Sequence, residues 1–314
     1  MRDTKHRALL LLPLWGACFL PDLSSKPCKD SSGCFTGYFC DTSRATADTI
    51  GYCTEGTFEG MGGSGVAPAV LVMVVGGPTT IGSTDGSYTT KMTPPHSRTV
   101  GTFYLEDREV TVAAYRKCVD SGTCSRPHSA NGLLGSEPCN YDFPGRDSHP
   151  VNCVDYEQAT TYCGWLGRRL PTEAEWEVAA VGLTSSTGDK YPWGSTADES
   201  KACFFKTDQR TCVVASKVKT MSGAEVAASA PGFYDLAGNV LEWTVSEPCA
   251  YSSGSSAPNP SCSTTNRIIR GGSAFDADIK SLRGTVRVAV EPARNQPKSS
   301  WDRNLGLRCA SNMP

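Results

Sequence analysis

The chain has 314 residues, of which 30 are basic and 32 are acidic, and its formal net charge is −2. A chain of this length can bury a large apolar core, so its length is no obstacle to stable folding. The near balance of charge leaves no strong basic field to hold nucleic acid, and nucleic-acid binding is not expected.

Residues 1–17 predict a signal peptide. They begin with basic residues and continue with a short apolar run from Ala8 to Trp15, which is too short to span a bilayer. Cys18 follows directly, as at the site where bacterial lipoproteins are cleaved and lipidated. We therefore expect an extracytoplasmic protein. It is either a bacterial lipoprotein held at the membrane only by a lipid on Cys18, or a protein secreted after ordinary cleavage nearby.

The cysteine count agrees with a lipid on Cys18. The chain has 15 cysteines, so a modified Cys18 leaves an even number that can pair completely in an oxidising compartment. Four of them lie in residues 18–53, a polar stretch that predicts a small disulfide-rich module: Cys28, Cys34, Cys40 and Cys53. Their pairing stays open, and the module is either a recognition element or a spacer. The Gly-rich residues 54–65 then predict a flexible linker.

Residues 66–314 predict one main domain, rich in Gly, Pro and Ser, with short strands, long ordered loops and two clear helices. The first helix should begin after Asp155, which forms a capping box with Gln158. Its buried face should hold Ala159, Tyr162, Cys163 and Leu166, and Gly167 should end it.

The second helix should begin after Thr172, with Glu175 completing a second capping box. Its core face should hold Ala174, Val178 and Ala179. Glu173, Glu175 and Glu177 diverge around a helix axis, so we expect them to serve in capping and on a solvated surface, not as a catalytic pair.

Eight further cysteines are close sequence neighbours, which predicts local disulfides that staple loops. The expected pairs are Cys118–Cys124, Cys139–Cys153, Cys203–Cys212 and Cys249–Cys262.

Four motifs follow in order along the main domain. They are residues 73–77 with 81–83 and Glu109-Val110-Thr111; residues 149–155 with 159–165 and Arg169 to Glu177; residues 234–243; and Arg270-Gly271-Gly272-Ser273 with residues 304–309. Together they resemble the formylglycine-generating enzyme (sulfatase-modifying factor) family, which includes ergothioneine- and pyoverdine-pathway oxidases. The resemblance covers Val66 to Pro314 and implies an α+β, C-type-lectin-like fold. It also implies a disulfide between Cys163 and Cys309, which should contribute on the order of 4 kcal/mol by closing a long loop.

The resemblance places Asp276 and Ser281 where the family keeps two cysteines that bind copper(I) and activate oxygen. Thiolates suit that soft ion, whereas a carboxylate and a hydroxyl do not, so we expect no copper and no formylglycine-generating activity. An iron site of the ergothioneine type would need histidines, and His96, His128 and His149 show no ligand spacing.

Two binding sites are implied by the same resemblance. Asp235, Gly238, Val240 and Glu242 match a structural calcium site; the alternative is a tight Gly-Asn turn whose Glu242 pairs with an arginine. A groove bordered by Arg270, Ser273, Asp276, Arg283 and Arg287 would suit an extended peptide or a small anion; the alternative is that these arginines pair with carboxylates.

These observations favour an exported binding or structural module that has lost copper catalysis, with a peptide or an envelope protein as its expected partner. The competing interpretation is an oxidoreductase of the broader family that uses non-haem iron or another cofactor. A calcium-dependent carbohydrate binder ranks last because it rests on fold analogy alone.

Overall fold

The computed structural model describes residues 27–28, 38–41, 51–55, 69–88, 92–128, 139–183, 191–205, 210–227, 230–249, 266–290 and 304–313. The chain divides into two compact units, Met1–Gly60 and Met61–Pro314. In the first unit, strands β1 (Pro27–Cys28), β2 (Tyr38–Asp41) and β3 (Gly51–Glu55) form an antiparallel sheet in the order β1-β3-β2. The predicted signal peptide and Cys18 lie outside the described residues.

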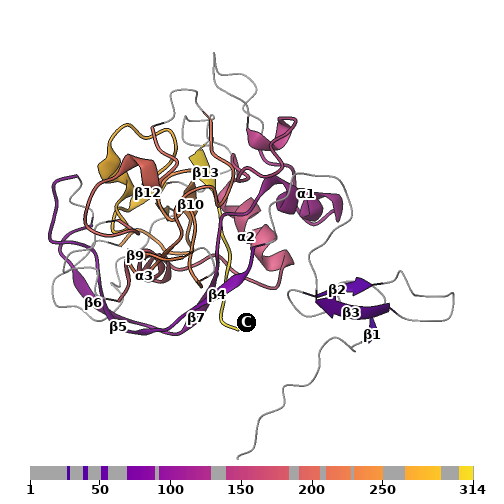
Figure 1. The fold of residues 1–314 in the computed structure, drawn as a ribbon, viewed down its shortest axis with the longest axis horizontal. Coiled ribbons are helices and arrows are strands. Elements are labelled where there is room, and N and C mark those ends of the chain that lie inside the picture. The colour runs from indigo at the N-terminus through magenta and orange to yellow at the C-terminus, as the bar shows by residue number, and fades with distance from the viewer. Residues whose placement is uncertain are drawn as a thin grey trace, which may run out of the picture. The chain divides into compact units, whose positions relative to one another are not determined.

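The described residues of the second unit form two sheets and two hairpins (Figure 1). The larger sheet has the order β12 (Val288–Val290), β11 (Arg267–Arg270), β10 (Leu241–Trp243) and β13 (Leu305–Gly306), with only the β10–β13 pair parallel. The smaller sheet has the order β14 (Ala310–Ser311), β7 (Phe103–Glu106) and β4 (Leu71–Val74). The hairpins are β5 (Gly77–Ile81) with β6 (His96–Val100), and β8 (Thr220–Met221) with β9 (Ala224–Glu225).

The described residues of this unit contain three α-helices, α1 (Val112–Asp120), α2 (Tyr156–Trp165) and α3 (Glu173–Val181). Short 3-10 turns are η4 (Asn140–Asp142), η6 (Glu199–Lys201) and η7 (Ile279–Leu282). Figure 1 shows α1 and α2 on one side of the domain and the β5–β6 hairpin on the opposite side. None of the helices within the described ranges is long and apolar enough to cross a membrane. The predicted α+β fold, with few helices and much ordered loop, is confirmed.

Helix α1 was not predicted from the sequence. It begins after Thr111, whose side chain accepts a hydrogen bond from the amide of Ala114. Val112, Tyr115 and Cys118 are buried on one face of the helix. The sequence therefore contained a cap, an apolar face and a glycine stop at Gly122, but a run of only nine residues gave a weak helical pattern.

Both predicted helices are confirmed with their capping boxes. Asp155 and Gln158 exchange side-chain and backbone hydrogen bonds, and so do Thr172 and Glu175. Gly167 has φ 68°, and the amides after α2 bond back to the last turn in a Schellman arrangement. The prediction is wrong for one residue of the buried face. Leu166 is exposed, because it lies at the C-cap of α2, where the chain turns away from the core.

Two large apolar clusters form the core. One joins α1 and α2 to the larger sheet and includes Tyr115, Tyr162 and Trp243. The other joins α3 to the smaller sheet and the β5–β6 hairpin and includes Trp176 and Phe233. Helix α3 thus stands between the hairpin and the larger sheet, in contact with β5, β8 and β11.

Four of the five predicted disulfides in this unit are confirmed: Cys118–Cys124, Cys139–Cys153, Cys163–Cys309 and Cys203–Cys212. Cys249 is disulfide-bonded, while its predicted partner Cys262 lies outside the described residues. Because Cys163 lies on α2 and Cys309 directly precedes β14, their bond ties the first core cluster to the end of the chain.

Candidate functional site

Residues from the four sequence motifs meet in a buried polar network. The carboxylate of Glu242, on β10, accepts hydrogen bonds from Arg308 at 2.7–2.9 Å and from the indole Nε1 of Trp176 at 2.7 Å. Glu109 accepts hydrogen bonds from the side chain of Asn239 and from the backbone amide of Val240. Segments from all parts of the main domain therefore depend on one another through these contacts.

Three carboxylates around Arg308 outnumber the cation. Glu109 and Glu242 are fully buried, and Asp235 is 5% exposed. Burial raises the pKa of Glu109 well above its usual value, and the charges of Asp235 and Glu242 raise it further. Burial also raises the pKa of Asp235 to about 6. When ionised, these carboxylates give this part of the core an excess of negative charge, and burial favours their neutral forms.

The four predicted calcium ligands lie at this network. Asp235 Oδ2 accepts a hydrogen bond from the amide of Ala215, while its buried Oδ1 has no hydrogen-bond partner in the described structure. Glu242 makes the arginine pair that the alternative interpretation anticipated. Gly238 has φ 82°, and a Cβ there would lie 2.3 Å from the carbonyl oxygen of Cys203, so only glycine fits this turn.

The orphaned oxygen of Asp235 and the local excess of negative charge fit a bound cation. The pairing of Glu242 with Arg308 occupies one of the two predicted side-chain ligands. No three His, Cys, Asp or Glu side chains converge as a metal-ligand group within the described residues. A site made of two carboxylates and two backbone carbonyls is a different kind of ligand group, so calcium stays a prediction.

Asp276 and Ser281, which the resemblance places where the family keeps its two copper-binding cysteines, lie close to each other. Asp276 Oδ2 accepts a hydrogen bond of 2.7 Å from the amide of Ser273 and so fixes the turn after β11. Burial raises the pKa of Asp276, and the hydrogen bond from the amide of Ser273 acts in the opposite direction. The nearby Tyr88 also has a raised pKa, chiefly through burial and then through Asp276.

The predicted groove does not form as one surface. Arg270 is fully buried and pairs with Glu177, and Arg283 pairs with Asp85 at 3.2 Å. Arg287 forms a two-point ion pair with Glu173, with distances of 2.6 and 2.7 Å. Of these arginines, Arg287 lines a cavity beside the start of α3.

The ion pairs correct the expectation for α3. Glu175 caps the helix as predicted, but Glu173 and Glu177 do not lie on a solvated surface: they are 7% and 0% exposed. Arginines from β11 and from the segment before β12 reach them, and Glu177 also accepts a hydrogen bond from the amide of Gly82. Burial raises the pKa of Glu177, while the charge of Arg270 lowers it.

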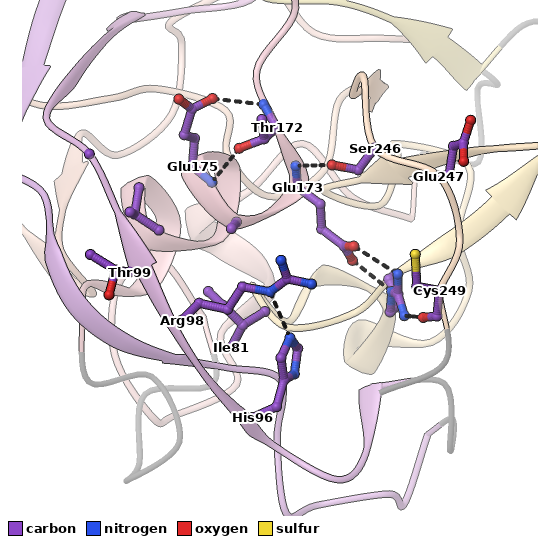
Figure 2. Close-up of a pocket in the computed structure, with 14 residues that line it drawn as sticks. Ile81, His96, Arg98, Thr99, Thr172, Glu173, Glu175, Ser246, Glu247 and Cys249 are labelled. Atoms are coloured by element: carbon purple, nitrogen blue, oxygen red, sulfur yellow. Dashed lines mark hydrogen bonds and ion pairs between the residues drawn. The ribbon is translucent and has the colours of Figure 1, made fainter. Parts of the chain in front are cut away.

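The cavity beside Arg287 has a volume of about 640 Å³. Its walls are the inner face of β6, the N-terminal turn of α3 and the segment from Ser246 to Cys249 (Figure 2). On β6, alternate residues point inward, which brings His96, Arg98 and Val100 to one face. Figure 2 shows His96 and Arg98 projecting from β6 toward the start of α3, where Glu173 lies.

Sequence reasoning missed this cavity. It treated His96 only as a possible metal ligand and did not consider Arg98. The alternation of His96, Arg98 and Val100 in a short strand was the available signal, because a basic residue on an inward face needs a partner.

The three histidines of the main domain each contact a different residue. Arg98 Nε donates to His96 Nε2 at 3.1 Å, His128 contacts Asp155 at 2.8 Å, and His149 contacts Thr211 at 2.9 Å. Burial lowers the pKa of His96 and of His149.

The chain resembles several known proteins. It is 31% identical over 256 residues to the serine/threonine-protein kinase Pkn1 of Chlamydia trachomatis, covering 77% of this chain but 38% of the kinase. The chain thus spans about two fifths of that relative. It is 36% identical over 183 residues to the formylglycine-generating enzyme of Streptomyces coelicolor, covering 56% of each chain. It is also 36% identical over 168 residues to the inactive C-alpha-formylglycine-generating enzyme 2 of Bos taurus, covering 52% of this chain and 50% of the relative.

Among solved structures, PvdO from Pseudomonas aeruginosa superposes with a TM-score of 0.58 at 22% identity, over 77% of this chain and 94% of PvdO. This likeness shows a shared fold. The sequence profile described as "Sulfatase-modifying factor enzyme 1-like domain" matches residues 61–313. The chain therefore belongs to the formylglycine-generating enzyme (sulfatase-modifying factor) family.

Proposed function

We propose that this protein is an exported binding module whose family domain does not carry out copper-dependent oxidation. The observation that carries the proposal is the side-chain chemistry at Asp276 and Ser281, which offer a carboxylate and a hydroxyl where the resemblance leads us to expect thiolates. Asp276 is engaged in holding the turn at Ser273. A relative from Bos taurus is itself named as inactive, so loss of activity has a parallel among similar proteins.

Export and a lipid on Cys18 belong to the same proposal. The disulfides of the main domain are compatible with an oxidising compartment, where such bonds form and persist. The apolar run before Cys18 would direct the chain there. Mass spectrometry of the protein purified from its membrane fraction tests this step: a mature N-terminus at Cys18 carrying acyl chains is expected, and an unmodified Cys18 would contradict it.

We include a structural calcium ion in the proposal, held by Asp235 and Glu242 with the carbonyl oxygens of Gly238 and Val240. The support is the unbonded buried oxygen of Asp235 and the excess of carboxylates around Arg308. A hard divalent cation would offset that charge and rigidify the turn. Glu109, whose oxygens accept hydrogen bonds from Asn239 and Val240, adds a further carboxyl group beside this turn.

The test of lost copper chemistry measures metal content and free thiols on the purified mature chain. After exposure to copper(I) and removal of excess metal, we expect less than stoichiometric copper, no free thiol, and no oxygen consumption with a cysteine-containing peptide. The control is the double variant Asp276→Cys/Ser281→Cys, which places two thiols at adjacent positions and should retain copper(I). Stoichiometric copper in the unmodified chain together with oxygen consumption would overturn the proposal.

A further inference from the structure

The cavity between β6, the start of α3 and the Ser246–Cys249 segment does not include Asp276 or Ser281, the residues at the family's copper-binding positions. Its volume of about 640 Å³ is in the range of cavities that hold small organic molecules or a few peptide residues. A function for this cavity must come from the groups in its walls.

The carboxylates of the cavity are each paired with an arginine. Glu173 binds Arg287, Glu175 binds Arg169 at 2.6 Å, and Glu247 lies 3.4 Å from Arg267. Each of these lining carboxylates is therefore balanced by an arginine.

Arg98 has no such partner. Within the described ranges, its guanidinium makes one hydrogen bond, from Nε to His96, and no carboxylate there lies within ion-pair distance of it. Since the other charges in the walls are balanced, Arg98 leaves one unbalanced positive charge in the cavity.

The position of Arg98 is held from both sides. Its backbone pairs with Thr79 in the β5–β6 hairpin, and His96 accepts the hydrogen bond of its Nε. Because arginine can only donate, His96 Nε2 must be the unprotonated nitrogen of the ring. The two terminal nitrogens remain for a ligand, and together they form the planar fork that matches two oxygens of one acid group. Figure 2 shows this guanidinium directed into the space between β6 and Glu173.

We propose that the cavity binds a carboxylate group of an organic ligand, with Arg98 as its two-point partner. This assignment rests on the proposed binding function and names its ligand class. A single negative charge balances Arg98, whereas a phosphate group carries about −1.5 to −2 charges at neutral pH and would leave an excess of negative charge in the cavity. The apolar side chains of Ile81, Val100 and Ala174 would contact the carbon skeleton of the ligand.

The experiment uses the mature chain and ligand-observed NMR with four probes. They are N-acetyl-trialanine with a free C-terminus, the same peptide as its C-terminal amide, succinate, and inorganic phosphate. We expect the free-acid peptide or succinate to bind, and the amide to bind at least about tenfold more weakly because it cannot form the charged two-point pair. Binding of the peptide acid alone identifies a peptide terminus as the source of the carboxylate; binding of succinate as well identifies the carboxylate itself.

Arg98→Gln should weaken carboxylate binding at least about tenfold, and Arg98→Lys should recover only part of it, because lysine keeps the charge and loses the fork. The matched control is Arg126→Gln, which removes an exposed arginine that pairs with Asp142 far from the lining residues, and it should bind as the unmodified chain does. Circular dichroism of each variant checks folding, and Arg98→Lys decides the matter if Arg98→Gln does not fold.

Three results would overturn this inference: no carboxylate binding at millimolar concentration, equal binding of acid and amide, or phosphate binding that depends on Arg98 and exceeds that of the carboxylates. None of these results tests the proposed loss of copper chemistry, which the metal and thiol measurements test separately. A chain that binds copper stoichiometrically and also binds carboxylates through Arg98 would contradict the proposed function and leave this site in place.

Discussion

At the scale of single residues, Asp235 is the carboxylate whose burial has the clearest consequence. One of its oxygens accepts a hydrogen bond from Ala215, and the other has no hydrogen-bond partner among the described residues. Its pKa is raised to about 6, because burial disfavours the charged form and Glu242 adds a further negative charge. Ionised Asp235 therefore weakens the fold unless a cation compensates it.

The substitution Asp235→Asn tests that cost. A pKa that is higher in the folded than in the unfolded state gives stability that is present below pH 4 and lost as pH rises toward 6. With a chelator present, the variant should be more stable than the unmodified chain at pH 8, by up to about 3 kcal/mol. The difference should nearly vanish below pH 4, since both side chains are then neutral. Urea unfolding at the two pH values gives the comparison.

Calcium should reverse that order if Asp235 is a ligand. Added calcium stabilises a protein in proportion to its binding to the folded state, and the gain should be larger for the charged aspartate than for asparagine. A variant that is less stable than the unmodified chain at pH 8 in chelator would contradict the excess of negative charge argued for this network.

At the scale of elements, the N-terminal ends of α2 and α3 could be predicted from the sequence, whereas the residues that pack against α3 could not. Capping boxes are local, so Asp155, Thr172 and their partners three residues later could be identified in the sequence. The arginines that bury Glu177 and Glu173 lie 93 and 114 residues away. No local pattern marks such a partner, and for that reason the carboxylates of α3 were placed on a solvated face.

The same distinction explains the candidate site. The local cysteine pairs followed from their spacing in the sequence, whereas the Cys163–Cys309 pair and the interest in Asp276 and Ser281 came from the family resemblance. The cavity depends on β6 facing the start of α3, a contact between segments more than 70 residues apart in the sequence. Arg98 could be given a role only after that contact was known.

The unpredicted helix α1 depends on its cap. Thr111→Ala removes the acceptor for the amide of Ala114 and should destabilise the domain by about 1 kcal/mol. The matched control is Thr160→Ala on the exposed surface of α2, where the hydroxyl bonds only to the carbonyl one turn earlier. That change should be neutral or slightly stabilising, because alanine favours the helix. Equal losses in urea unfolding would show that Thr111 does not act as a cap.

At the scale of the whole domain, the four sequence motifs are parts of one core. Trp176 and Arg308 both bind Glu242, Arg270 binds Glu177, and Glu109 holds the turn of the third motif. Any member of the family that folds in this way needs these contacts, whatever its chemistry. This is why the motifs predicted the fold well and said little about activity, which depends on positions between them.

The Cys163–Cys309 disulfide acts on this scale, because it closes a loop of 146 residues around the core. In the chain-entropy model, such a bond stabilises by roughly 5 kcal/mol, while the Cys118–Cys124 bond, with a separation of 6, contributes only about 2 kcal/mol. The double variants Cys163→Ser/Cys309→Ser and Cys118→Ser/Cys124→Ser therefore form a matched pair. All four sulfur positions are buried, so both variants carry a similar packing cost.

Urea unfolding of the two double variants should show the larger loss for the long loop. If both lose the same free energy, loop length is not what makes these bonds stabilising, and the cost comes from placing hydroxyls in the core. If the long-loop variant loses much more, its disulfide limits the unfolded chain. The bond raises the free energy of the unfolded state, and this gain in stability offsets the cost of burying the incompletely compensated charges around Arg308.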